Sequence, residues 1–99
     1  MVINIQKFIS STYNIPINML KGKSSIRNSE HYKMYNLSIL LCWLLHPTQV
    51  YGCKSTIARL HKCNMNRVHR LNSLYLNNSK FKSFVDNVIK HYKSNYASN

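Results

Sequence analysis

The fold is decided by Ser55-Thr-Ile-Ala-Arg-Leu-His-Lys-Cys-Asn-Met-Asn-Arg-Val-His-Arg-Leu71, a stretch whose pattern predicts two short helices joined by a tight turn. The first helix carries the small residue Ala58, which lets a partner helix come close. The second has Val68, Leu71 and Tyr75 at the three-to-four-residue spacing of a buried face. The stretch therefore predicts a packed helical pair.

The predicted second helix also has a polar and basic face. At about 100° per residue, Asn66, His69 and Arg70 fall opposite the buried Val68. Arg67 lies on the flank of the same helix. A helix-turn-helix presents such a recognition helix to the major groove of DNA. The pattern favours DNA binding, and an ordinary helical hairpin with a solvated basic face is the alternative.

The composition indicates one domain and an anionic partner. The 99 residues leave little room for a second core. A hydrophobic fraction of 44%, with only two glycines and two prolines, speaks against disorder and for a compact helical fold. Fourteen Lys and Arg against two acids give a formal net charge of +12. Because such an excess repels itself in the folded state, we expect a polyanion as partner, nucleic acid first and an acidic membrane surface second.

The sequence favours a cytoplasmic protein over a membrane or secreted one. The apolar run Leu37 to Leu45 is far shorter than the roughly twenty residues of a membrane-spanning helix. The amino terminus lacks a basic segment followed by an apolar run, so we expect no signal peptide. Reduced thiols fit better than a disulfide framework, because the cysteines are odd in number and lack CxxC spacing: Cys42, Cys53 and Cys63.

Helical periodicity continues on both sides of the opening stretch. Further helices are predicted over Ile3–Tyr13, Pro16–Leu20, Glu30–Leu45 and Lys80–Tyr92. The sum is an all-α bundle of about six helices with no convincing strand. We expect residues 1–93 to form one domain and residues 94–99 to be a frayed tail.

Two of the predicted helices have well-defined buried residues. The helix Glu30–Leu45 is apolar nearly all round, which is typical of a central helix, and Trp43 is expected in the core. His46-Pro47 should end it, followed by a loop to Cys53 that contains Gly52. The buried face of the last helix is predicted to consist of Phe81, Phe84, Val85, Val88 and Ile89.

With this order of elements, the chain resembles the carboxy-terminal DNA-binding domain of the bacterial replication initiator DnaA. The closest match is Tyr13-Asn-Ile-Pro-Ile-Asn-Met-Leu-Lys-Gly-Lys-Ser24, which is similar to that family's segment ending in Leu-Lys-Gly-Lys-Ser. Arg27 falls where the family keeps a basic residue, and Lys33 where it has an arginine at the start of its long helix. The resemblance covers roughly Ile5 to Tyr92. It implies an all-α, Trp-repressor-like fold containing a helix-turn-helix.

The family's Gly-Gly-Arg-Asp-His-Thr-Thr-Val signature leads into its recognition helix. It falls on His61 to Val68 of this chain, where only the valine agrees. In that family the Asp, His and Thr of the run make base contacts, and basic loop residues hold the DNA backbone. The resemblance thus implies a retained scaffold with different base-reading residues, and a role in replication initiation or its regulation. Because the family's ATPase domain and phosphate-cradling glycine loop are not found, we expect a stand-alone module without a cofactor.

DNA binding on this scaffold would divide between phosphate contacts and base reading. Phosphate contacts, whose strength falls steeply with salt, are predicted for Lys21, Lys23, Ser24, Arg27, Lys33, Lys54, Ser55 and His69. Asparagine pairs in a bidentate way with adenine and arginine with guanine, each giving about 1–3 kcal/mol of discrimination. Base reading is predicted for Asn64, Asn66, Arg67 and Arg70. Substitution of the second group should relax sequence preference, and substitution of the loop cations should weaken all sequences alike.

Other functions are less well supported by the residues. A metal site is not expected, because Cys53, His61, Cys63 and His69 match no closed zinc spacing. Enzymatic activity is not expected either, because the two carboxylates fall on different predicted helices. No small-molecule substrate is indicated. A small transcriptional regulator, a phage- or plasmid-encoded factor, and a basic module that docks an acidic protein remain alternatives, and the oligomeric state stays open.

Overall fold

The computed structural model describes residues 2–21, 29–46 and 51–94, and every regular element within these ranges is helical. They contain five α-helices and one short 3-10 helix: α1 (Val2–Tyr13), η1 (Ile17–Leu20), α2 (Ser29–Leu44), α3 (Tyr51–Leu60), α4 (Met65–Asn77) and α5 (Ser79–Tyr92). The prediction of an all-α fold is confirmed for this part of the chain. No helix in the described ranges is long and apolar enough to cross a membrane.

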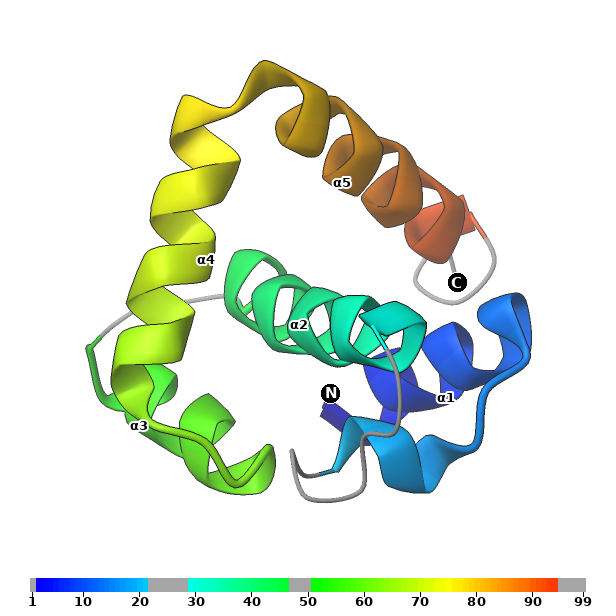
Figure 1. Ribbon diagram of the computed structural model, residues 1–99, viewed down its shortest axis with the longest axis horizontal. Helices are drawn as coiled ribbons and strands as arrows, with labels where there is room; N and C mark the ends of the chain where they lie inside the picture. Colours follow the sequence, from blue (N-terminus) through cyan, green and yellow to red (C-terminus); the bar gives the residue numbers. More distant parts are fainter. Residues whose placement is uncertain (1, 22–28, 47–50, 95–99) are drawn as a thin grey trace.

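The central element is α2, which runs through the middle of the molecule with the other helices around it (Figure 1). Nearly every side chain from Met34 to Trp43 is buried, so the helix has no wide polar face there. A helix that is apolar nearly all round must be covered by neighbours on several sides. The prediction of a central helix is therefore confirmed, and Trp43 lies in the core as expected.

Helices α1 and α5 cover one side of α2. The ring of Phe8 on α1 meets the ring of Tyr92 on α5 edge-on, with centroids 5.2 Å apart. The buried stripe of α5 consists of Val85, Val88 and Tyr92. The prediction that Phe84 belongs to this stripe is wrong, since Phe84 is 43% exposed. Val85 faces the core directly. Phe84, one residue earlier, is rotated by about 100° around the helix axis and so lies at the edge of the stripe.

Helices α3 and α4 pack against each other and are joined by residues 61–64. The chain leaves α3 through the left-handed residue Lys62, at φ 54°. The Cys63 amide then donates to the Ala58 carbonyl oxygen at 2.9 Å, which satisfies an acceptor that the helix end leaves free. The side-chain oxygen of Asn64 caps α4 by accepting the Asn66 amide at 2.8 Å. The short turn and α4 lie where the sequence predicts them.

Two predicted boundaries are corrected. The segment after Pro16 forms a single 3-10 turn of four residues, which is too few for a stable α-helix. The loop predicted to reach Cys53 is wrong, because α3 begins at Tyr51 and includes Gly52 and Cys53 in its first turn. Helices draw most of their stability from the burial of one face, so a glycine in the first turn is tolerated. The predicted tail lies, from residue 95 on, outside the described residues.

Candidate nucleic-acid interface

A polar strip follows the outer side of α4. It consists of side chains that are all exposed and that recur every three to four residues: Asn66, Arg70, Ser73 and Asn77. The opposite side of α4 is held in the core by Val68 and Leu71. Because the helix is fixed by its buried face and by its cap, the strip is presented on a rigid element.

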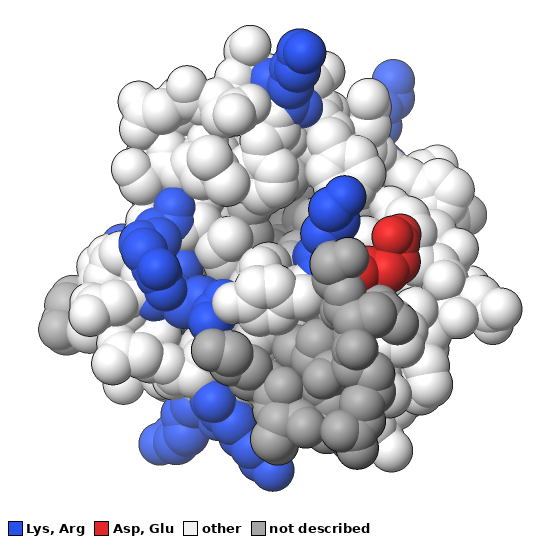
Figure 2. Space-filling model, viewed as in Figure 1, with Lys and Arg blue, Asp and Glu red and all other residues white. Residues whose placement is uncertain are grey.

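The sequence that contains this strip is basic. No carboxylate occurs in the sequence between Glu30 and Asp86. The α3–α4 segment carries five cationic side chains within that interval: Lys54, Arg59, Lys62, Arg67 and Arg70. Figure 2 shows Lys and Arg side chains over the left and lower left of the molecule, where Figure 1 places α4 and α3. The acidic atoms visible in that view lie to the right of its centre. This face therefore carries positive charge without an acidic neighbour in the intervening sequence.

Two predicted phosphate contacts, Lys54 and His69, meet between α3 and α4. The Lys54 ammonium lies 3.1 Å from Nδ1 of His69 and 4.6 Å from the centre of the Trp43 ring. An ammonium can only donate, so Nδ1 of His69 accepts and the imidazole proton resides on Nε2. His69 is left with an N–H donor on the side away from Lys54. The pair is partly buried, and its orientation is fixed by the aromatic ring beneath Lys54.

The side chain of Arg67, a predicted base reader, is engaged within the protein. Its guanidinium donates to the Tyr32 hydroxyl and, at 3.0 Å, to the side-chain oxygen of Asn36. It also lies over the Tyr32 and Tyr35 rings, 5.1 Å and 5.8 Å from their centres. These contacts tie α4 to α2. The geometry suits Arg67 to holding the helix rather than reaching a base edge.

The other residues predicted to contact DNA are spread over several elements, and some of them lie outside the described residues. Asn64 uses its side-chain oxygen for the cap of α4, which leaves its amide group as a donor. Lys21, Lys33 and Ser55 are exposed, on η1, α2 and α3 respectively or directly beside them. The predicted contacts of the basic loop fall outside the described residues: Lys23, Ser24 and Arg27.

A buried polar cluster under the turn was missed by sequence reasoning. The Tyr35 hydroxyl donates to the backbone oxygen of His61 at 2.7 Å. The His61 ring lies between Ser38 Oγ, 2.8 Å from Nε2, and the Ile57 carbonyl oxygen, 2.9 Å from Nδ1. A carbonyl can only accept, so Nδ1 carries the proton and Nε2 accepts the Ser38 hydroxyl. All three polar side chains are fully buried, and together they fix the end of α3 from the side of α2.

Burial of His61 makes the stability of the fold depend on pH. Burial lowers the pKa of His61 below its ordinary value of 6.5, against an opposing hydrogen bond to Ile57. The unfolded chain therefore binds the proton more readily than the folded one. The free energy of unfolding should be at its full value above about pH 6.5, where His61 is neutral in both states. It should decrease as the pH falls below that value.

Urea denaturation at pH 7.5 and pH 5.5 would measure this decrease. Carboxylates contribute little in that window, because the chain has only two of them and their ordinary pKa values lie near 4. His61→Gln should flatten the dependence. Equal slopes for the protein and its His61→Gln variant would contradict the assignment.

A metal site gains no geometric support. Within the described ranges, no three residues of the His, Cys, Asp and Glu types come together in a way that could hold an ion. Ring nitrogens of His61 and His69 already form hydrogen bonds with Ser38, Ile57 and Lys54.

Comparisons with known protein families, with curated proteins and with solved structures find no match to the chain.

Proposed function

We propose that the protein binds double-stranded DNA, with α3 and α4 acting as a helix-turn-helix and α4 lying in the major groove. One observation carries the proposal: exposed Asn66 and Arg70 project from a rigid helix in a basic segment of sequence, Lys54 to Arg70, that contains no carboxylate. A helix of this kind fits the major groove, and the surrounding cations suit the phosphates on either side.

Base reading is assigned to the outer strip of α4. Asn66 can pair with adenine through its carboxamide, and Arg70 with guanine through its guanidinium. Both side chains are exposed and stand one turn apart, so they can reach neighbouring base pairs. Arg67 is assigned to positioning α4 against α2, because its guanidinium is already held by Tyr32 and Asn36. Asn64 is assigned mainly to the cap of α4.

Phosphate contacts are assigned to the flanks of the helix pair. Lys54 offers an ammonium and His69 an imidazole N–H that points away from it, so each can contact a phosphate of the DNA backbone. Two further exposed side chains can contact neighbouring phosphates of the DNA backbone: Lys62, at the turn, and Ser55, on α3. These contacts position the protein without reading sequence.

The resemblance to the DnaA carboxy-terminal domain supports a role in replication initiation or its regulation. A small transcriptional regulator on the same scaffold is the alternative. Selection of bound duplexes from a random pool would separate the two roles. Selected sites that cluster at a replication origin of the encoding genome support the first, and sites placed singly at promoters support the second.

The test of the proposal is duplex binding as a function of salt. Fluorescence anisotropy with a labelled random-sequence duplex should show binding at 50 mM salt that weakens by about a hundredfold or more at 200 mM, because several phosphates are neutralised. Lys54→Ala should lower both the affinity and the salt slope. Lys7→Ala, which removes one charge from the exposed side of α1, is the matched control and should change little. Absence of duplex binding at low salt would contradict the proposal and favour an acidic protein partner.

A further inference from the structure

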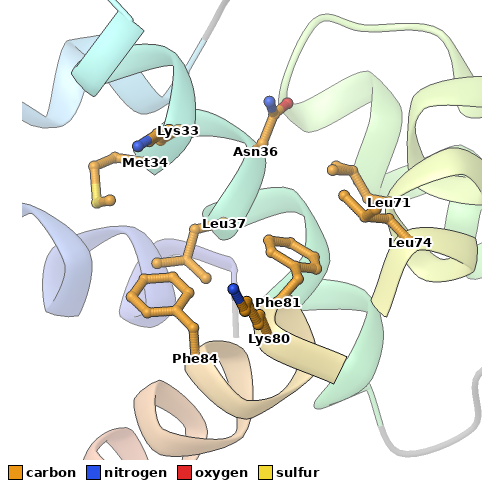
Figure 3. Close-up of a pocket in the computed structure, with 9 residues that line it drawn as sticks. All are labelled: Lys33, Met34, Asn36, Leu37, Leu71, Leu74, Lys80, Phe81 and Phe84. Atoms are coloured by element: carbon orange, nitrogen blue, oxygen red, sulfur yellow. The ribbon is translucent and has the colours of Figure 1, made fainter. Parts of the chain in front are cut away.

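A hollow of about 470 Å³ lies between α2, α4 and α5, apart from the polar strip of α4. Figure 3 shows its lining side chains, which come from all three helices. Six of the lining residues are apolar: Met34, Leu37, Leu71, Leu74, Phe81 and Phe84. A volume of this size lies within the range of about 300–1,000 Å³ that is typical of small-ligand sites.

The hollow exposes apolar surface that the fold leaves uncovered. Its inner wall is formed by Met34 and Leu37, which are only 5% and 2% exposed. Its mouth is formed by Leu74 and Phe84, each 43% exposed. In Figure 3 the Phe81 and Phe84 side chains reach from α5 toward Leu37 on α2. Large apolar side chains exposed around a concave site indicate that something apolar binds there.

The polar groups that remain available to a ligand around the hollow are hydrogen-bond donors. Lys33 and Lys80 line it, both are exposed, and neither has an ion-pair partner in the described part of the chain. Asn36 also lines it, and its side-chain oxygen is taken by Arg67, so the amide group is what it can still offer. A rim with two ammonium groups and an amide donor is complementary to an anion.

The position of Lys80 strengthens this point. Lys80 lies in the first turn of α5, where the helix dipole disfavours a cation. The other lysine of that turn, Lys82, is compensated by Asp86 and by the Tyr75 hydroxyl. Lys80 has no such compensation among the described residues. An anion bound beside it would supply the missing charge.

The charge and the shape of the hollow select its occupant. A symmetric contact with a second copy would bring lysines of both copies together in a chain of net charge +12, which is unfavourable. A peptide helix needs an extended groove, whereas this hollow is a half-open cavity bounded by α2, α4 and α5. We propose that it binds a small amphipathic carboxylate, whose apolar body packs against Leu37 and Phe84 and whose carboxylate lies between Lys33 and Lys80.

Titration of the DNA-free protein with decanoate tests the proposal, and its outcome is independent of DNA binding. Chemical shifts of the Leu37, Leu71 and Leu74 methyl groups should change with a saturable dependence on decanoate. Decanol and decyltrimethylammonium have the same chain without a carboxylate and should bind at least about tenfold more weakly. Equal binding of the three compounds, shifts centred elsewhere, or no binding would each overturn the proposal. Capture of an acidic peptide instead of decanoate would also overturn it.

Matched variants separate this site from general attraction of anions by a basic protein. Lys80→Gln should weaken decanoate binding about fivefold, whereas Lys90→Gln, the same charge loss later on α5, should leave it unchanged. Phe84→Ala should weaken it about tenfold. Leu76→Ala, which removes a 64% exposed side chain outside the hollow, is its control. Equal effects within either pair would contradict the assignment.

Discussion

Arg70→Ala is expected to lower the affinity for the preferred duplex by about tenfold to a hundredfold while changing random-duplex binding only severalfold. The guanidinium is exposed on the outer strip of α4 and is a candidate bidentate partner of guanine. Loss of a base contact affects only the sequence that it reads, whereas loss of a charge affects every sequence. Competition binding with the duplex selected from a random pool and with its scrambled version would measure both effects.

Arg59→Ala is the matched control for this prediction. Arg59 is an exposed arginine on α3, so its removal costs the same charge without touching the strip of α4. It should weaken the selected and scrambled duplexes alike. Asn66→Ala should behave as Arg70→Ala does, with relaxed preference at a different base pair. A uniform loss for Arg70→Ala, as large on scrambled DNA as on the selected site, would show that Arg70 only neutralises phosphate.

Helix positions followed from the sequence because their signals are local. The three-to-four-residue spacing of Val68, Leu71 and Tyr75 places the inner face of α4 without knowledge of its neighbours. Asn78 directly precedes α5 and is a residue type that commonly caps helices, and its side-chain oxygen accepts the Phe81 amide at 2.9 Å. The central place of α2 followed from its nearly continuous apolar surface. Such features depend on residues a few positions apart.

The contacts of Arg67 did not follow from the sequence, because they join distant segments. Helical periodicity placed Arg67 on the flank of α4, and that position agrees with the structure. Its partners Tyr32 and Asn36 lie on α2, 35 and 31 positions earlier in the sequence. No local pattern marks such a pair. An arginine on the flank of a polar face, opposite a helix rich in tyrosine, is the signal that could have suggested it.

The hollow beside α5 was also beyond sequence reasoning, for a different reason. Phe81, Phe84 and Val85 share a helical spacing that fits one buried face, so the pattern assigned them all to the core. Helix α5 meets the core mainly through Val85 and its neighbours in the stripe, which leaves Phe84 at the mouth of a gap between three helices. The width of such a gap depends on how the helices are placed in space. Periodicity within one helix carries no information on it.

Tyr35→Ala is expected to lower the free energy of unfolding by about 3–5 kcal/mol, a large part of the stability of a small domain. The side chain is fully buried on α2 and packs beside Tyr32 and His61, with ring centroids 6.2 Å and 6.1 Å away. Tyr35→Phe keeps the ring and removes only the hydroxyl, which leaves the His61 carbonyl oxygen without its donor. Loss of this hydrogen bond should lower the free energy of unfolding by about 1–3 kcal/mol.

The hydroxyl of Tyr35 links this stability to the shape of the turn. Burial is the main cause that raises the pKa of the phenol well above its usual value, so the hydroxyl stays protonated and donates at every accessible pH. Its acceptor, His61, is the first residue after α3, at the start of the turn that sets the direction of α4. Tyr35→Phe should therefore loosen the turn in a protein that still folds.

Urea denaturation and amide hydrogen exchange together test the role of Tyr35. In the Tyr35→Phe variant, the Cys63 amide, which donates to Ala58, should exchange faster relative to amides in the middle of α5. Tyr32→Phe is the control, because its hydroxyl is only part-buried and bonds Arg67 rather than the turn. It should lower stability less and leave exchange at Cys63 unchanged. Unfolding energies within about 0.3 kcal/mol for Tyr35→Phe and the unmodified chain would show that the Tyr35–His61 bond does not hold the turn.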